Sequence, residues 1–244
     1  MFLSKIWFFL VAVAGAIALT LALVMPKPAE RKEQVDEKRR LVDACSVTNI
    51  LLTENARARI DLAGEFARVE SIAKVLREAA GEPKISAERN HTARKAARTL
   101  LNDMEAQGSN PPDFVIMLDA TGRVVGRVGM DEPEYGDSMA GYYLIDEALA
   151  GYLRDDLWHY DRGLYRVAAA PVIDRSIDAR GRYVGAVVLG HHINNDFATS
   201  LAKRLKFEVS FYVGERAVAS STTTQLHTEV IDTFKEIGTP ERFP

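Results

Sequence analysis

Residues 114–128 have the sequence FVIMLDATGRVVGRV, in which two apolar, β-branched runs flank the polar segment 119–122. Valine and isoleucine favour extended strands, whereas aspartate and glycine favour tight turns. The stretch therefore predicts a β-hairpin. The same composition recurs in two further pairs of apolar runs, at 164–172 with 183–189 and at 209–213 with 217–219. Together they predict about six short strands, paired in sequence order as an antiparallel meander.

Upstream of these strands, residues 26–110 have the periodicity of helices. Between 29 and 80 there is no proline and a single glycine, Gly64, and apolar residues recur at every third or fourth position. This pattern predicts one long amphipathic helix, which ends before Pro83 because proline cannot continue the hydrogen-bond ladder. Ser86 is expected to cap a second helix. The long helix either packs only on the sheet or also pairs with a second copy as a dimerising stalk.

After a short tail, residues 1–5, the segment 6–25 contains no charged side chain. A helix rises about 1.5 Å per residue, so this segment can cross a hydrocarbon core of about 30 Å. The run is longer than the apolar core of a typical signal peptide, which favours an uncleaved transmembrane helix. Lys5 precedes it, and six basic residues follow it before residue 41. By the positive-inside rule alone, the carboxyl side would be cytoplasmic.

Composition narrows the function classes. The chain has 244 residues, a net charge of −3 and 47% hydrophobic residues, which suit one sizeable core or two small ones. Its dispersed, nearly balanced charge argues against a nucleic-acid partner. The single cysteine, Cys45, excludes an internal disulfide and a zinc site built on paired cysteines.

Catalytic and metal sites are not expected. The fingerprints of serine hydrolases, P-loop enzymes, zinc proteases and dinucleotide-binding enzymes do not occur in the sequence, so we expect no catalytic residue, no enzyme activity and no cofactor. His191 and His192 are adjacent at a predicted strand end, and neighbouring strand residues point to opposite faces, so they are unsuited to hold one ion. One of residues 194–196 is instead expected to cap a helix over 197–205.

Six short motifs occur in a recognisable order: LDxxGRVV at 118–125, YGD at 135–137, ALAG at 148–151, AAPV at 169–172, GAVVLG at 185–190 and VASS at 218–221. In this order they resemble the Cache family of bacterial extracytoplasmic sensor domains. The resemblance implies an α+β fold. A long N-terminal helix, made of membrane span and stalk, would precede a PAS-like antiparallel sheet of about five to six strands flanked by helices over 111–224. A C-terminal segment, 225–244, would follow.

The resemblance also implies where a ligand sits. Residues 131–143 are too polar and glycine-rich for a strand, and they are expected to form a loop before a short helix over 144–152. In PAS-like sensors such a loop and helix enclose the ligand against one sheet face, which places a pocket under residues 131–160. Aromatic walls, an arginine fork for a carboxylate, or a carboxylate for an amine would complete it. The candidate ligand-binding residues are Arg127, Tyr135, Tyr142, Tyr143, Trp158, Tyr160, Tyr165, Arg166 and Asp174.

Each candidate also has a plain alternative, since strand tyrosines and tryptophans are commonly packing residues and strand arginines are commonly solvated. Arg154 and Asp161 are further candidates on the same reasoning.

The function implied by the resemblance is that of a membrane-anchored sensory domain that binds a small molecule and relays a signal through its long N-terminal helix. It would be a single-pass inner-membrane protein with its C-terminal domain in the periplasm, contrary to the orientation that the basic residues favour. The expected partners are a small-molecule ligand of unspecified class, the membrane and, if the stalk dimerises, a second copy. The alternative is an envelope structural or protein-interaction domain without a ligand. With no output module in the sequence, the chain is expected to be either part of a receptor or a stand-alone sensor.

Overall fold

The computed structural model describes part of the chain, namely residues 13, 26–131, 133–176 and 181–222. The chain divides into two compact units, Met1–Leu52 and Thr53–Pro244. Apart from residue 13, the predicted membrane span at 6–25 lies outside the described residues, as does the segment 225–244. Among the helices of the described ranges, none combines the length and the apolar character that a membrane crossing requires.

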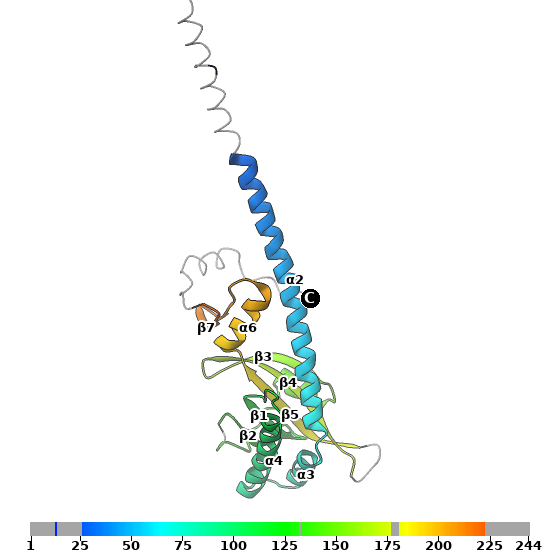
Figure 1. Cartoon of the computed structure of the whole chain (residues 1–244). Coiled ribbons are helices and arrows are strands. Elements are labelled where there is room, and N and C mark those ends of the chain that lie inside the picture. Colours follow the sequence, from blue (N-terminus) through cyan, green and yellow to red (C-terminus); the bar gives the residue numbers. More distant parts are fainter. Residues whose placement is uncertain (1–12, 14–25, 132, 177–180, 223–244) are drawn as a thin grey trace, which may run out of the picture. The chain divides into compact units, whose positions relative to one another are not determined.

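A five-stranded sheet forms the centre of the second unit (Figure 1). All neighbouring strands are antiparallel, in the order β2-β1-β5-β4-β3. The strands are β1 Phe114–Asp119, β2 Val124–Val128, β3 Arg154–Tyr160, β4 Gly163–Asp174 and β5 Arg182–His192. The hairpin predicted from residues 114–128 is present as β1 and β2, and the α+β class is confirmed.

The predicted pairs 114–118 with 123–128 and 164–172 with 183–189 are present as β1–β2 and β4–β5, but the order of the strands in the sheet is not that of a meander. β1 pairs with β5 as well as with β2, because every residue of β1 is buried and its backbone groups need partners on both edges. The last predicted pair, β6 Ser210–Val213 and β7 Arg216–Ser220, forms a separate two-stranded sheet. The sequence pattern also missed β3, which is an edge strand with mostly exposed residues and therefore lacks an apolar run.

The helix predicted between 29 and 80 is two helices, α2 Pro26–Ala67 and α3 Glu70–Ala79. The chain turns at Val69, whose φ of −70° and ψ of 123° are extended. No proline or glycine marks this break. α3 instead buries Ile72, Val75 and Leu76 in the core beneath the sheet, and this packing outweighs the helical propensity of the junction.

Both predicted N-caps are confirmed. The Ser86 hydroxyl accepts a hydrogen bond from the Arg89 amide at 3.2 Å, and α4 runs over Ala87–Ala106. The Asn194 side chain accepts one from the Phe197 amide at 2.9 Å, and α6 runs over Asn195–Leu205. The short helix predicted after the polar loop is α5, Tyr143–Leu149. Capping chemistry is local, which is why sequence alone located these helix starts.

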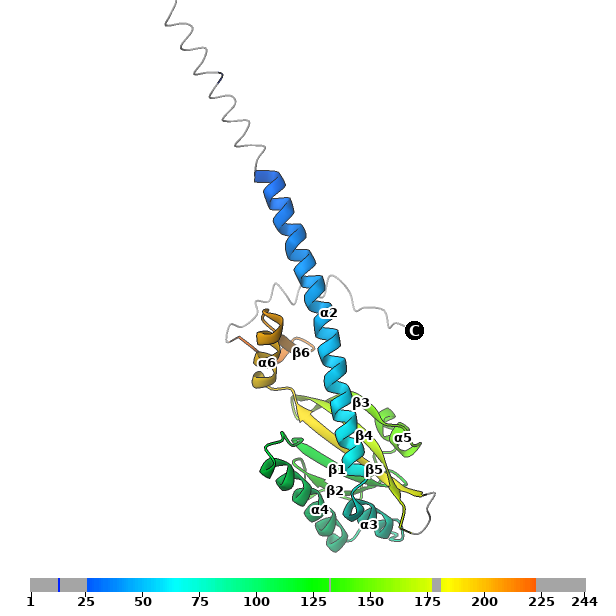
Figure 2. The same ribbon diagram turned by 45° about the vertical axis from the view of Figure 1, so that its right-hand side comes forward.

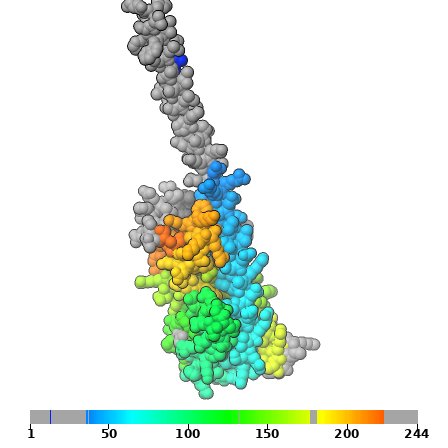
Figure 3. Space-filling model, viewed as in Figure 1, coloured from blue at the N-terminus to red at the C-terminus, as the bar shows by residue number. Residues whose placement is uncertain are grey.

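The sheet has an apolar core on each face. The α3/α4 core contains Leu76, Val115 and Met117, and α3 and α4 form a continuous outer surface over it (Figure 3). The α5 core contains Phe114 and Ile116 together with residues of α5, which lies against β3 and β4 (Figure 2). Alternate residues of β1 therefore supply both cores, as the pleat of a strand requires.

We expect Gly190→Ala to destabilise the domain. Gly190 lies opposite Phe114 in the pairing of β1 with β5, and a Cβ there would come within 2.1 Å of the Phe114 ring. Phe114 is buried and packs edge-on against Tyr165, with ring centroids 5.4 Å apart, so its ring is confined. Overpacking costs about 1–3 kcal/mol, which would appear as a lower midpoint in urea-induced unfolding.

The matched control is Gly81→Ala, because the atom nearest to an added Cβ there is the Glu78 carbonyl oxygen at 3.8 Å. This variant should keep the wild-type midpoint. When Phe114 is replaced by leucine, Gly190→Ala should lower the free energy of unfolding by less than it does in the wild type. An equal cost in the two backgrounds would contradict the steric explanation.

Candidate functional site

A cavity of about 400 Å³ lies between the α5 side of the sheet and the loop that follows β2. Its volume is typical of small-molecule sites. We call it the β3 cavity, since β3 forms one of its walls. Its lining residues come from β1, β2, the loop and β3, and they are Ile116, Arg127, Met130, Asp131, Asp137, Ser138, Met139, Tyr142, Leu157, Trp158, His159 and Tyr160.

A β-bulge in β2 places Arg127 in this cavity. The register passes from Met117 opposite Gly126 to Leu118 opposite Val124, so Val125 is an extra residue on β2. Val125 belongs to the α3/α4 core, whereas Arg127 is opposite Ile116 of the α5 core. Val124 and Arg127, three residues apart, both lie on the α5 face, whereas in a strand without the bulge they would lie on opposite faces.

The guanidinium of Arg127 is buried and already has acidic partners. One terminal nitrogen donates to an Asp137 carboxylate oxygen at 2.6 Å, and the other donates to the Glu134 carbonyl at 3.2 Å and lies 3.7 Å from the Glu134 carboxylate. The positive charge is therefore compensated by the loop itself. These bonds attach the loop to β2, and they occupy donors that the sequence had suggested for a ligand carboxylate.

Backbone hydrogen bonds also hold the loop along β2. The Val124 amide donates to the Asp137 carbonyl at 2.9 Å, and the Gly136 amide donates to the Val124 carbonyl at 2.8 Å. The Met139 amide donates to the Gly122 carbonyl at 2.8 Å. The loop thus continues the sheet for a few residues before it crosses over the cavity, so its position depends on the β1–β2 hairpin.

Aromatic side chains of β3 and the loop form the opposite wall. Trp158 and Tyr160 are two residues apart on β3 and share a face. Tyr142, the residue before α5, approaches Trp158 with ring centroids 6.2 Å apart and planes inclined by 47°. The two rings are tilted relative to each other and are not stacked.

The structure brings four predicted site residues together in the β3 cavity: Arg127, Tyr142, Trp158 and Tyr160. Tyr165 lies opposite Trp158 in the pairing of β3 with β4, and its ring packs on Phe114 and His192. Burial, with a smaller effect of Asp113 and Asp161, raises the pKa of Tyr165.

The remaining predicted residues lie elsewhere. Tyr135 packs against the α3/α4 core, and Tyr143 is 69% exposed. Arg154 is paired with Glu147 at 3.0 Å, and Asp161 is exposed in the turn after β3. None of these four residues lines the β3 cavity.

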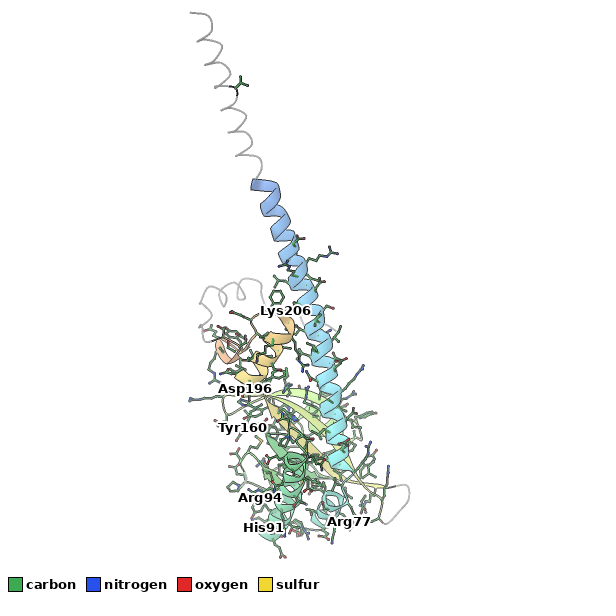
Figure 4. The ribbon with its side chains drawn as sticks, viewed as in Figure 1. Arg77, His91, Arg94, Tyr160, Asp196 and Lys206 are labelled. Carbon is green, nitrogen blue, oxygen red and sulfur yellow. The ribbon has the colours of Figure 1, made fainter. Side chains whose placement is uncertain are left out.

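Asp174 is buried beside α3 rather than in the cavity. Its carboxylate accepts hydrogen bonds from the Ser176 amide at 2.9 Å and from Arg77 at 2.6 Å. The hydrogen bonds from Ser176, followed by that from Arg77, lower the pKa of Asp174 to about 2. Figure 4 shows Arg77 well separated from Tyr160, so Asp174 and the β3 cavity are distinct places in the fold.

Arg166 projects from the other face of β4, next to His191. The two residues are opposite each other in the pairing of β4 with β5, and the Arg166 guanidinium lies 3.7 Å from the centroid of the Phe197 ring. Burial, together with the charge of Arg59, lowers the pKa of Arg166 to about 10. Burial and the charge of Arg166 lower the pKa of His191 to about 4. Arg166 and His191 therefore lie together outside the β3 cavity.

Sequence reasoning missed several cavity residues, including Met130, Asp131, Met139 and His159. The polar loop was expected to cover the site, but a loop sequence does not show which of its side chains point inward. His159 and Leu157 were missed because β3 itself was missed. In the parts of the chain that the structure describes, no group of three metal-ligating side chains converges.

Comparison with solved structures supports the fold. The chain is similar to the periplasmic domain of Vibrio cholerae LuxQ, with a TM-score of 0.51 and 14% identity over 75% of this chain and 79% of that chain. It is also similar to the extracellular domain of vpHK1S-Z8 (TM-score 0.48, 14% identity, 81% of this chain and 75% of that chain). A third similar structure is the Escherichia coli DcuS sensor domain (TM-score 0.39, 16% identity, 62% of this chain and 94% of that chain).

Of these three, the first alone exceeds a TM-score of 0.5, and at 14% identity it establishes the fold and not the ligand. The resemblance to PAS-like extracytoplasmic sensor domains is therefore confirmed at the level of the fold. A scan against family models and a search of curated proteins gave no match.

We expect the domain to lose stability as the pH falls from about 6.5 to about 4, because the pKa of His191 is about 4 in the folded state and an unfolded histidine titrates near 6.5. The unfolded chain binds the proton first, so acid favours unfolding in this window. At pH 5 the loss is about 2 kcal/mol relative to pH 7.5. The groups that act on His191 are Arg166 and Arg59, which lower its pKa, and Asp113, which raises it.

Urea-induced unfolding at several pH values would measure the effect. His191→Gln should make the free energy of unfolding less dependent on pH between pH 4 and 6.5. His91→Gln, at an exposed position on α4, should leave this pH dependence unchanged. The stabilisation from Asp174, whose pKa is lowered from 3.8, is lost mainly below pH 4, so it affects only the acid end of this window. An unchanged slope in His191→Gln would show that other groups cause the acid sensitivity.

Proposed function

We propose that this chain is an extracytoplasmic sensory domain that is anchored in the inner membrane by residues 6–25 and binds a small molecule in the β3 cavity. The observation that carries the proposal is the cavity of about 400 Å³, walled by aromatic side chains and covered by a loop, on the fold of a periplasmic domain. Binding without turnover is part of the proposal.

The walls suit reversible binding of a small molecule. Ile116, Met130 and Met139 supply apolar surface, and Trp158, Tyr142 and Tyr160 combine apolar rings with hydrogen-bond donors. A few fixed polar groups among apolar walls are the usual composition of a ligand site. The loop is attached to β2 by the Arg127–Asp137 pair, so the cavity is largely formed before a ligand enters.

Ligand binding in the β3 cavity would affect α2 through β3. Trp158 and Tyr160 lie on the cavity side of β3, while Asp155 faces the other way and pairs with Arg59 of α2 at 3.1 Å. A ligand that displaces β3 would therefore pull on Arg59 through a partly buried ion pair. α2 continues toward residues 6–25, so this ion pair is where the signal would enter the N-terminal helix.

Dimerisation with a second copy of the chain would involve α2. Four apolar residues of this helix are exposed, with exposed fractions from 44% to 60%, namely Leu41, Val42, Val47 and Ile50. At about 100° per residue these four positions are distributed around the helix and do not form one apolar stripe, so a second helix would cover only some of them. Dimerisation through 41–50 is part of the proposed signalling route because packing against a second helix would still bury part of this exposed apolar surface.

One observation favours the alternative of a protein-interaction domain. Tyr143, Tyr152 and Leu157, near one another in sequence around α5 and β3, have exposed fractions of 69%, 55% and 58%. Exposed apolar surface beside an unpaired strand edge is typical of a protein-binding face. In that case Tyr143→Ala would weaken partner binding, and no small molecule would stabilise the domain.

We expect a small molecule from a library of amino acids, organic acids, amines, purines and divalent metal ions to raise the thermal midpoint of the full-length protein in detergent. A ligand at a hundred times its dissociation constant adds about 2.7 kcal/mol, which moves the midpoint by several degrees. Trp158→Ala should remove this stabilisation and leave the ligand-free protein folded, because Trp158 is only partly buried and lines the cavity.

The matched control is Tyr152→Ala, which removes an exposed aromatic ring outside the cavity and should keep the full shift. A shift that persists in Trp158→Ala would place the ligand elsewhere. No shift with any compound would favour the protein-interaction domain.

We expect ligand binding to change the environment of a fluorophore attached to Cys45, the only cysteine, which is on α2. Asp155→Asn should abolish this response but keep the thermal shift, because it removes the charge that holds Arg59 and leaves the cavity residues intact. Asp156→Asn changes the neighbouring exposed carboxylate on the same strand and should leave the response unchanged. A full response in Asp155→Asn would exclude this ion pair as the route.

A further inference from the structure

The charged groups around the β3 cavity are unequal in number. Two carboxylates, Asp131 and Asp137, and one guanidinium, Arg127, line it. Arg127 is paired with Asp137 at 2.6 Å and has a second acidic neighbour in Glu134 at 3.7 Å. A ligand carboxylate would therefore have to compete with two carboxylates of the protein for this one buried cation.

Asp131 is the cavity carboxylate that is not paired with Arg127. Within the described residues no cationic side chain forms a salt bridge with it, and it lies in the wall of the cavity. Its backbone has a φ of 35°, in the left-handed region that aspartate tolerates better than most residues. The turn it occupies includes a hydrogen bond from the Glu134 amide to its carbonyl at 2.8 Å, which fixes the backbone at this position.

The aromatic wall attracts positive charge as well. The faces of tryptophan and tyrosine rings carry negative electrostatic potential, and a cation gains when it lies within about 6 Å of a ring centroid. The centroids of Trp158 and Tyr142 are 6.2 Å apart, so one cation between them can lie within about 6 Å of both centroids. Tyr160 adds a third ring to the same wall.

On the premise of the proposed ligand-binding function, we propose that the β3 cavity takes an organic cation, a primary or quaternary ammonium compound, with its charge against Trp158, Tyr142 and Asp131. The apolar part of the ligand lies against Met130, Met139 and Ile116. Asp131 thus has the role of the amine-binding carboxylate, for which the sequence had suggested Asp161 or Asp174. Arg127 is a positioning residue that holds the loop.

Calorimetric titration of the full-length protein in detergent with matched probes tests the charge requirement. The probes are choline, the neutral alcohol in which a tert-butyl group replaces the trimethylammonium group, and pivalate, which carries the same tert-butyl group on a carboxylate. Phenethylamine serves as a primary amine. We expect choline or phenethylamine to bind, and the cation to bind about tenfold more tightly than its neutral or anionic counterpart.

Substitutions in the wall of the cavity test where the cation binds. Trp158→Ala should weaken binding of the cation by about tenfold, and Trp158→Phe should weaken it less because a ring face is kept. Asp131→Asn removes the charge and keeps a residue that also tolerates the left-handed backbone. It should weaken binding of the cation severalfold and leave binding of the neutral probe unchanged. Tyr143→Ala, beside Tyr142 but outside the cavity, should bind as the wild type does.

Two outcomes overturn the inference. In the first outcome, the neutral alcohol or pivalate binds as tightly as choline, and Trp158→Ala weakens this binding. The cavity then binds a ligand but does not select a cation, and the proposed sensory function stands. If neither choline nor phenethylamine binds, the organic-cation proposal fails. The wider thermal screen then decides separately whether the protein has any small-molecule ligand.

Discussion

The burial of β1 on both faces of the sheet is the constraint on which the other elements depend. Its side chains alternate between the α3/α4 core and the α5 core, and its backbone has no access to water on either edge. Unpaired backbone groups would cost free energy there, so β1 must be flanked by β2 and β5. The positions of α3, α4 and α5 follow, because each covers one of the two faces that β1 helps to form.

The second level of organisation is the ion pair between the buried Arg127 and the exposed Asp137. A guanidinium at 7% exposure requires compensation, and the loop after β2 supplies it with a carboxylate and a carbonyl. The same contacts place Met130, Met139 and Tyr142 over the sheet. The charge of Arg127 thus holds the loop over the sheet, and the proposed ligand would meet the aromatic rings and Asp131.

β3 connects the cavity with the N-terminal helix because a strand has two faces. Trp158 and Tyr160 meet the cavity on one face, and Asp155 meets Arg59 on the other. As an edge strand, β3 is hydrogen-bonded only to β4 in the sheet and can shift with less disruption than a central strand. Ligand selection and signal relay are therefore proposed to involve the same seven residues, Arg154–Tyr160.

Local signals in the sequence determined the hairpin at 114–128 and the caps at Ser86 and Asn194, and the family resemblance pointed to four of the residues that line the cavity. Tertiary structure alone decided the pairing of β1 with β5, the break at Val69 and the placement of Arg166 and Asp174 away from the cavity. Turns and caps depend on neighbouring residues, which the sequence shows directly. Sheet order, a one-residue bulge and the choice of face depend on register between distant segments, where a shift of one residue turns a side chain from one face to the other.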